Sequence, residues 1–464
     1  MPVSGRYSAP VPGTLHDAPP VEPGPGGTPG DDDGRRRRAV VALAVWGALI
    51  LVSVAWGAYV TEVGERLRIH APPLTGTYDW RIGRNVAPAV VLGVAVVAFG
   101  PSLARRLSWV RVLVLVGLGS IAWAVSLGIF DGIDALTDPL LPKQYIRSVP
   151  KVGDPFTFLS QFTDRITTYN IHTQGHPPGM VLVLWVLDRV GLGGLGWNAV
   201  LVFAGGGAGV VAALVALREV AGEASARTAA PFMVVMPAAI WWTSGDAFFS
   251  AVAGWGVTLV VLATGRTGRR ADVLAFGGGL LFGVAAFLSY GLVLLAAIPL
   301  VVAVARRRFR PIVVACVGAL PVFLAFLAAG FWWFAGLAAT RERYFAGVAS
   351  RRSYAYFLVG NLGAFAIATG PAVAVALAWL RDRGVWLLVG GALVVVALAD
   401  LSGMSKAEVE RIWVPFVPWV VLATAAFISD PDRRGRMRQP TMRAWLGLQV
   451  ASGLLVQLAV RSPW

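Results

Sequence analysis

Three acidic residues gather where a long apolar run ends near residue 130. Asp131, Asp134 and Asp138 lie within eight residues of one another. A carboxylate at such a boundary can be partly desolvated, which raises its pKa toward the range of a general base. We therefore consider Asp131 and Asp134 as candidates to take a proton from a hydroxyl group. A solvated helix end is the alternative interpretation of the same cluster.

Two of the four histidines lie within one five-residue stretch. His172 and His176 stand just before Pro177 and Pro178. Because prolines favour an extended backbone in the residues before them, the pair is not expected to share a helix face as metal ligands would. We expect both imidazoles to bind hydroxyl or phosphate groups of a substrate, while metal ligation and a structural role stay open.

A further acid, Asp246, joins two apolar runs directly after Trp241-Trp242-Thr243-Ser244-Gly245. An ionisable residue at membrane depth is costly and is by default a functional candidate. Asp is also a preferred residue at helix N-caps, so a capping role is the alternative. We predict that Asp246 contacts substrate.

Arginines accompany these groups late in the chain. Glu410 and Arg411 stand where an apolar run begins, and Arg341 and Arg343 lie in the polar segment 338–355. The planar guanidinium fork matches phosphate oxygens. We expect the three arginines to bind an anionic substrate, with contact to lipid headgroups as the alternative. Glu410 is expected to contact the substrate beside Arg411.

The composition indicates what kind of protein must position these residues. Of the 464 residues, 56% are hydrophobic and only 14% are charged, whereas soluble domains carry about a quarter charged residues. The chain is therefore expected to be an all-α polytopic membrane protein. The single Cys316 excludes an internal disulfide and a cysteine-based metal cage.

Thirteen apolar segments are long enough to be candidate transmembrane helices. Four polar segments between them are expected to be extracytoplasmic loops: 61–86, 131–196, 338–355 and 400–412. Residues 180–187 (MVLVLWVL) are too few for a span and are predicted to form a half-buried outer helix. The predicted spans are 39–60, 87–104, 109–130, 197–217, 228–242, 247–265, 272–288, 291–305, 311–335, 356–380, 385–400, 413–429 and 442–460.

Basic residues set the expected orientation. The Pro- and Gly-rich residues 1–38 are predicted to be a disordered cytoplasmic tail that ends in Arg35 to Arg38, and residues 39–464 form the transmembrane domain. Later basic clusters alternate consistently with a cytoplasmic N-terminus in a multi-pass protein of the plasma membrane. The formal charge of +15 is thereby explained by membrane orientation, and nucleic acid is not an expected partner.

Several motifs together resemble the GT-C superfamily of integral-membrane glycosyltransferases. The similarity lies in an acid just beyond a span (Asp131), a His-Pro-Pro stretch with a short apolar helix, and an Arg-x-Trp-x-Pro-x-x-Pro entry to a late span at Arg411. The resemblance implies polyprenyl-phosphate sugar donors, a base at Asp131 or Asp134, and Arg411 near the lipid phosphate. Three predicted spans precede the loop where many family members have one. The acids of 61–86, which are Glu62, Glu65 and Asp79, therefore stay open as the base.

The resemblance implies a single displacement in which a sugar passes from polyprenyl phosphate to an acceptor hydroxyl. The expected partners are that donor, a glycan, lipid or protein acceptor, and membrane lipid. No cofactor is firmly implied and a divalent cation stays open. From the Ala-, Val-, Gly- and Arg-rich composition we expect mannose or arabinose as the transferred sugar. The alternatives are a transporter or flippase, a non-catalytic cell-envelope subunit, and a ligase of lipid-linked glycans.

Overall fold

The chain folds as a bundle of helices, as the composition predicts. The computed structural model describes residues 29–64, 67–140, 145–428 and 439–464. Within these ranges, eight helices are long and apolar enough to cross a membrane. They are α1 (Pro29–Glu62), α2 (Ala87–Arg106), α3 (Trp109–Gly128), α7 (Leu195–Val234), α8 (Gly245–Thr264), α9 (Gly268–Leu288), α11 (Arg310–Ala328) and α15 (Arg383–Leu401).

A ninth span is formed if one bent pair is counted as a single crossing. Helices α13 (Tyr354–Thr369) and α14 (Pro371–Trp379) meet at 93°. Gly370 lies between them at a φ of 86°, which an L side chain rarely adopts. The backbone groups at the break are satisfied by Gln449, whose Nε2 donates to Thr369 O at 2.7 Å and whose Oε1 accepts from Ala372 N at 3.2 Å.

The predicted count of thirteen spans is therefore not confirmed, because several of the predicted segments are shorter or merged in the structure. Segment 197–217 and the first half of 228–242 lie within α7, which is kinked at Gly222, and the rest of 228–242 contains η7 (Pro237–Trp241). Two other segments form shorter apolar helices than a span requires, Tyr290–Arg306 and Val417–Phe427. They contain η8 (Tyr290–Ala296), α10 (Ala297–Arg306), α17 (Val417–Val421) and η10 (Leu422–Phe427), and the final helix is α18 (Gln439–Ala459).

Helix α1 also begins earlier than predicted. It starts at Pro29 rather than at Ala39, so Arg35 to Arg38 are helical. Arginine has a good helix propensity, and Asp33 near the helix start is favourable for the helix dipole. Residues 1–28 of the predicted tail lie outside the described residues.

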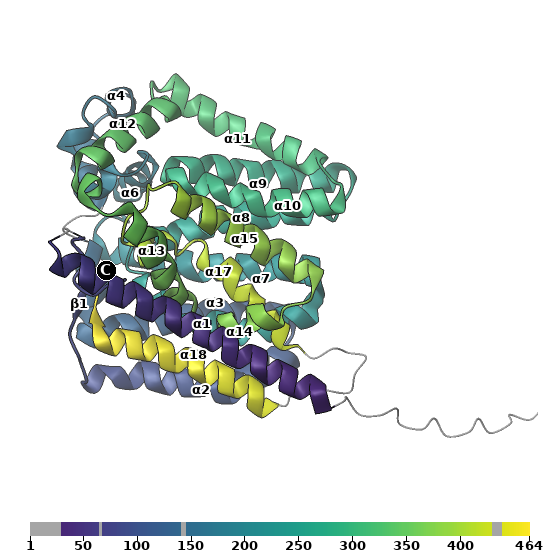
Figure 1. Cartoon of the computed structure of the whole chain (residues 1–464). Coiled ribbons are helices and arrows are strands. Elements are labelled where there is room, and N and C mark those ends of the chain that lie inside the picture. The colour runs from purple at the N-terminus through teal and green to yellow at the C-terminus, as the bar shows by residue number, and fades with distance from the viewer. Residues whose placement is uncertain (1–28, 65–66, 141–144, 429–438) are drawn as a thin grey trace, which may run out of the picture.

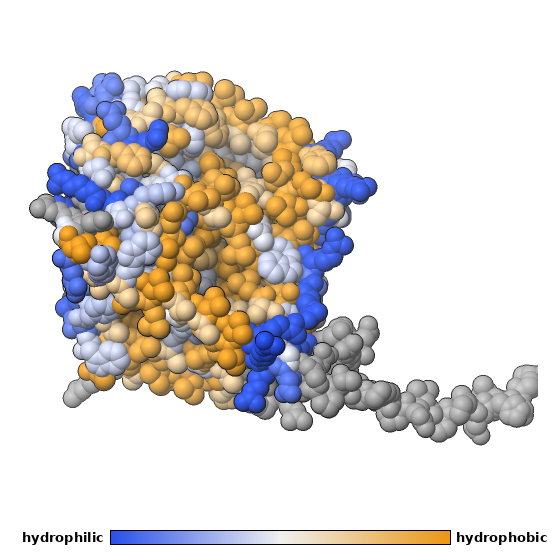
Figure 2. Space-filling view, in the orientation of Figure 1, coloured by the Kyte–Doolittle hydropathy of each residue, from blue (hydrophilic) through white to orange (hydrophobic). Residues whose placement is uncertain are grey.

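The short elements collect at one end of the bundle, which we call the loop face (Figure 1). The predicted outer helix is found here as α6 (Gly179–Arg189), whose 11 residues are too few to cross a bilayer. In the space-filling view, hydrophilic residues lie at both ends of the bundle with a mostly hydrophobic band between them (Figure 2). The other elements of the loop face are η2 (Ile129–Asp131), η3 (Ile133–Leu136), η4 (Asp138–Leu140), η5 (Tyr145–Lys151), α4 (Pro155–Ser160), η6 (Ile166–Thr168), α5 (Ile171–Gln174), α12 (Trp333–Ala346), η9 (Val348–Arg351) and α16 (Val409–Ile412).

Glycines bring α7 and α8 close together. A Cβ on Gly205 would lie 2.4 Å from the Cα of Phe248, and one on Gly209 would lie 2.4 Å from Ser250 Oγ. The Gly-rich stretch of α7 is therefore a helix-packing surface, as expected for small residues between membrane helices. This contact fixes the start of α8, where Asp246 lies.

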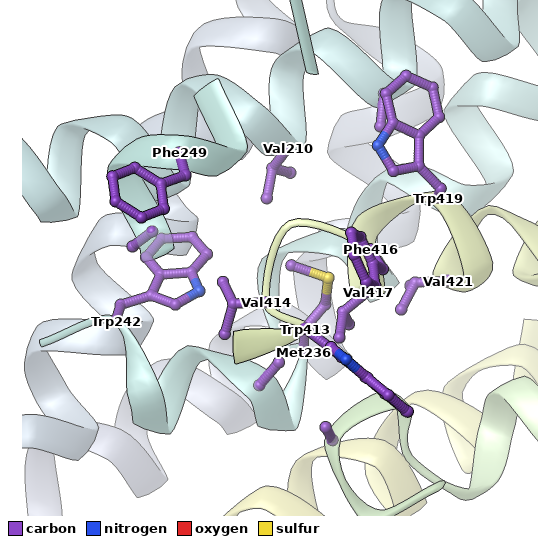
Figure 3. Packing of buried hydrophobic residues seen from close by; sticks show 14 of the residues in the cluster. Val210, Met236, Trp242, Phe249, Trp413, Val414, Phe416, Val417, Trp419 and Val421 are labelled. Carbon is purple, nitrogen blue, oxygen red and sulfur yellow. The ribbon is translucent and has the colours of Figure 1, made fainter. Parts of the chain in front are cut away.

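Aromatic and β-branched side chains fill the core beneath the loop face. Figure 3 shows Trp242, which lies between η7 (Pro237–Trp241) and α8, and Phe249 of α8 on one side. Trp413 and its neighbours up to Val421 occupy the other side. The indole of Trp413 is 1% exposed, so the segment that follows Arg411 is anchored within the bundle.

A short antiparallel ribbon carries the end of the described chain back to the loop face. Strand β1 (Thr77–Tyr78) pairs with β2 (Val460–Arg461), and η1 (Arg84–Val86) follows β1. The preceding segment is buried rather than solvated, since Leu67, Ile69 and Leu74 are each at most 3% exposed. The first predicted loop thus packs into the protein.

Candidate functional site

Arg411 holds together a buried ionic cluster at the loop face. Its Nη1 donates to Asp246 Oδ2 at 2.5 Å, and its Nη2 donates to Glu408 Oε2 at 2.9 Å. Arg411 and Asp246 are 3% and 2% exposed, and they are 165 residues apart in the sequence. Burying charges is costly unless they are paired, so α8 and α16 are tied together by this pair.

The capping role that was the alternative for Asp246 is not found. Ser244 occupies the N-cap position of α8, and Asp246 lies within the first helical turn. A carboxylate in that turn is favoured by the helix dipole. The side chain is thereby held where Arg411 can reach it, while Asp246 contributes no side-chain cap.

Aromatic rings enclose the guanidinium. The Arg411 Cζ lies 4.6 Å from the ring centroid of Trp464, within cation–π range. The Trp464 ring in turn lies 5.4 Å from that of His172. The ring of Tyr145 lies beside both histidines, with its centroid 6.0 Å from that of His172 and 5.4 Å from that of His176. We refer to Asp246, Glu408 and Arg411, with these four rings, as the Arg411 cluster.

The two histidines come from a segment fixed by hydrogen bonds among small polar residues. Asn170 Oδ1 accepts from Ser148 Oγ and from Thr173 Oγ1, both at 2.6 Å. His176 Nδ1 lies 2.9 Å from His172 O, so Nδ1 donates and Nε2 is left as an acceptor. Burial lowers the pKa of His176, which favours the neutral ring at neutral pH. A neutral His176 can accept a proton or a hydrogen bond from a hydroxyl group.

Glu410 lies beside this cluster and contacts the first polar segment. Its Oε1 accepts from Thr75 N at 2.9 Å, and the side chain is fully buried. Burial raises the pKa of Glu410 to about 7. The carboxyl group is thus poised between its neutral and charged forms near physiological pH.

Several buried polar atoms here have no partner in the described part of the chain. They are Tyr145 Oη, Glu410 Oε2 and Arg411 Nε. A buried donor or acceptor without a partner costs about 1–3 kcal/mol. Such atoms concentrated at one site are therefore available to bind a polar ligand.

The acids expected to be catalytic are held in a neighbouring position. The Asp131 carboxylate pairs with Arg81 Nη1. Arg81 Nη2 also donates to Gln457 O and to Val460 O, both at 2.7 Å. The Arg81–Asp131 pair therefore contacts the same C-terminal segment whose Trp464 lies over Arg411.

The remaining predicted residues divide between the site and the surface. Arg343 Nε donates to Gln174 Oε1 at 2.6 Å, next to the histidine segment. Arg341 is exposed and stacks on Phe345 at 5.8 Å. Asp134 is exposed on η3. The structure therefore brings His172, His176, Asp246 and Arg411 together, with Glu410 next to Arg411 in the chain and bonded to Thr75. Asp131, Asp134 and Arg341 lie outside that contact network.

The alternative acids of the first polar segment do not form a comparable site among the described residues. Glu62 is exposed at the end of α1, and Asp79 lies 3.6 Å from Arg461. Glu65 lies outside the described residues. Within the part of the chain that can be described, no group of three His, Cys, Asp or Glu side chains could hold a metal ion.

Four contributors were not identified from the sequence as site residues: Tyr145, Glu408, Trp464 and Arg81. Glu408 lies in the predicted loop 400–412, three residues before Arg411, so its charge could have marked it as a site residue from the sequence. Tyr145 and Trp464 belong to none of the motifs and carry no local pattern. Only the folding of η5 and β2 onto the loop face brings them to the cluster.

Comparisons with known proteins found a similarity to a solved structure. No family model matches this sequence, and no curated protein matches it. The chain is similar to the crystal structure of the Archaeoglobus fulgidus oligosaccharyltransferase, solved in complex with Zn and sulfate, at 16% identity and a TM-score of 0.42. The match covers 76% of this chain and 52% of that one, so the chain spans about half the length of the solved protein.

Proposed function

We propose that this protein is an integral-membrane glycosyltransferase of the GT-C kind. It transfers a sugar from a polyprenyl-phosphate donor to a hydroxyl group of an extracytoplasmic glycan, lipid or protein. The observation that carries the proposal is the Arg411 cluster, a buried ionic and aromatic site at the loop face of an otherwise apolar bundle. Lipid-linked donors need such a place, where a phosphate and a sugar meet at the membrane boundary.

Arg411 is proposed to bind the donor phosphate. Its guanidinium can form two parallel hydrogen bonds with phosphate oxygens. The side chain of Glu408 is 28% exposed, whereas that of Asp246 is 3% exposed. An incoming phosphate would therefore replace Glu408 at Nη2, while Asp246 keeps the guanidinium in place.

Asp131 is proposed to be the general base, with Asp134 as the next candidate. The acceptor hydroxyl gives its proton to the carboxylate, and its oxygen forms a bond to the anomeric carbon. The bond from that carbon to the phosphate oxygen breaks at the same time. The polyprenyl phosphate then leaves with a negative charge that Arg411 stabilises. Arg81 holds the Asp131 carboxylate in place.

Transfer from a synthetic donor tests this function. The purified protein in nanodiscs would receive farnesyl-phosphoryl mannose or arabinose with a cell-envelope acceptor fraction, and release of farnesyl phosphate would be measured. We expect Asp131→Asn to lower the rate at least a hundredfold, the typical contribution of a general base. Asp138→Asn is the matched control, because Asp138 is an exposed acid of the same cluster.

A second set of variants separates the two proposed roles. Arg411→Lys keeps the charge but loses the bidentate geometry, so it should raise the apparent KM for the donor. Full turnover by Asp131→Asn would exclude Asp131 as the base and leave Asp134 as the next candidate. Absence of transfer from both donors, with a correctly folded protein, would count against the proposed donors.

A transporter or flippase is the alternative that one observation favours. The break between α13 and α14 resembles the discontinuous helices of transporters. Such proteins typically carry a matching break in a second repeat. One bent pair is found among the described residues. Movement of a labelled lipid across a vesicle bilayer, without sugar transfer, would support this alternative.

A further inference from the structure

A long groove runs between α1 and the bent pair α13–α14, at the end of the bundle opposite the loop face. It encloses about 820 Å³ and is lined almost entirely by apolar side chains. Small residues leave this space open, chiefly Ala42 on α1 with Ala366 and Ala374 opposite it. Two hydrogen bonds tether α1 across the groove, from Trp46 Nε1 to Ala366 O at 3.0 Å and from Trp379 Nε1 to Arg35 O at 3.2 Å.

The groove opens sideways, toward the lipid. Val41 and Val45 line it and are 53% and 63% exposed. In Figure 2 this side of the bundle is hydrophobic, and hydrophilic residues lie at the start of α1. The groove is therefore open to an acyl chain from the surrounding bilayer.

Two arginines make one end of the groove cationic. Arg37 and Arg38 line it, while Arg36 on the same helix does not. From Arg38 to Leu49 the groove follows α1 for eleven residues, which is about 16 Å of helix. One leaflet of the hydrocarbon core is about 15 Å deep. A lipid with its headgroup at the arginines would thus reach the end of the groove with its tail.

We propose that this groove is a binding site for an anionic phospholipid. The phosphodiester headgroup binds Arg37 and Arg38, and an acyl chain lies between Ala42 and Ala374. Charge complementarity selects the anionic headgroup over a zwitterionic one. The site lies at the opposite end from the Arg411 cluster and does not depend on the proposed sugar transfer.

Competition between two lipids tests the headgroup. The full-length protein would be incubated with equal amounts of palmitoyl-oleoyl phosphatidylglycerol and phosphatidylcholine, and bound lipid would be counted by native mass spectrometry. We expect phosphatidylglycerol to be favoured about tenfold. Replacing both arginines (Arg37→Gln with Arg38→Gln) should remove this preference, whereas Arg36→Gln should keep it.

A matched pair of substitutions on α1 tests the groove itself. Ala42→Phe fills the groove and should lower phosphatidylglycerol binding, whereas Ala44→Phe places the same bulk on an exposed position outside it. Equal binding of both lipids to the unmodified protein would overturn the proposal. So would equal binding by Ala42→Phe and Ala44→Phe, or displacement of phosphatidylglycerol by a polyprenyl phosphate at equal concentration.

Discussion

At the scale of single residues, the site depends on charges removed from water. Arg411 is neutralised by Asp246 from α8 and by Glu408 from its own segment. A buried pair contributes little net stability, but removing one partner leaves an uncompensated charge behind. The Arg411 cluster is therefore sensitive to single substitutions in a way that surface ion pairs are not.

Asp246→Asn should destabilise the protein by about 3 kcal/mol, the usual cost of breaking a buried pair. Asp272→Asn is the matched control, because Asp272 pairs with Arg310, whose side chain is 77% exposed. That change should cost much less stability, because exposed ion pairs contribute little. Thermal unfolding in detergent would compare the two variants. A similar loss of thermal stability in both variants would mean that the buried pair contributes no more to stability than the exposed pair.

Glu410 predicts a pH dependence of stability. Burial raises its pKa to about 7, from about 4.5 in the unfolded chain. Between these two pH values the folded protein keeps a proton that the unfolded chain releases. The contribution of Glu410 to the free energy of unfolding is therefore greatest below about pH 4.5 and is lost as the pH rises through 7. Relative to Glu410→Gln, the unmodified protein should lose about 3 kcal/mol across that window.

Melting temperatures between pH 5 and pH 8 would measure this difference. Glu342→Gln serves as the control, since Glu342 is an exposed acid of the same face. A constant difference between the unmodified protein and Glu410→Gln over that range would contradict the buried position of Glu410.

At the scale of elements, the spacing of α7 and α8 decides where Asp246 stands. The two helices touch through Gly205 and Gly209, where any side chain would meet backbone or Ser250. A larger residue would push α8 outward and move Asp246 away from Arg411. The glycines are thus part of the site, although they contact no ligand.

Gly205→Leu should destabilise the bundle by about 2 kcal/mol, because overpacking a close contact costs about 1–3 kcal/mol. Gly447→Ala is the contrasting control, since a Cβ there meets no atom within 4 Å. It should be neutral or slightly stabilising, as alanine is the better helix former. The melting temperatures should therefore move in different directions. Equal tolerance at both positions would argue against the close packing of α7 on α8.

At the scale of the whole molecule, two polar ends with an apolar band between them fit a bilayer (Figure 2). Helix α1 starts at the end of the bundle opposite the loop face (Figure 1), and Arg37 and Arg38 lie in its first turns. The orientation of these ends is a prediction from the positive-inside rule. It places the Arg411 cluster outside the cytoplasm.

Cysteine labelling in intact cells tests that orientation. In a Cys316→Ser background, Thr157→Cys on the loop face should react with an impermeant thiol reagent added from outside. Arg36→Cys on α1 should react only after lysis. The reverse pattern would invert the membrane orientation and place the site in the cytoplasm.

The sequence alone determined that this is a helical membrane protein and which polar residues interrupt its apolar runs. Hydrophobic content and charge placement are properties of composition and order, so they can be read without a fold. The same information made His172, His176, Asp246 and Arg411 candidates, because ionisable groups are conspicuous in apolar surroundings. Its count of thirteen spans is not confirmed among the described residues, since the break at Gly370 and the short helix α17 depend on packing.

Only the tertiary structure decided which of these residues meet. The pair of Arg411 with Asp246 joins positions 165 residues apart, and Trp464 and Tyr145 reach it from two further segments. No local pattern encodes such contacts, because they follow from how α7, α8 and α16 pack and how β2 returns to β1. The same packing placed Asp131 beside Arg81 instead of within the cluster. Local sequence thus supplied the charged groups, and long-range packing set which of them pair, because a buried charge is costly without a partner.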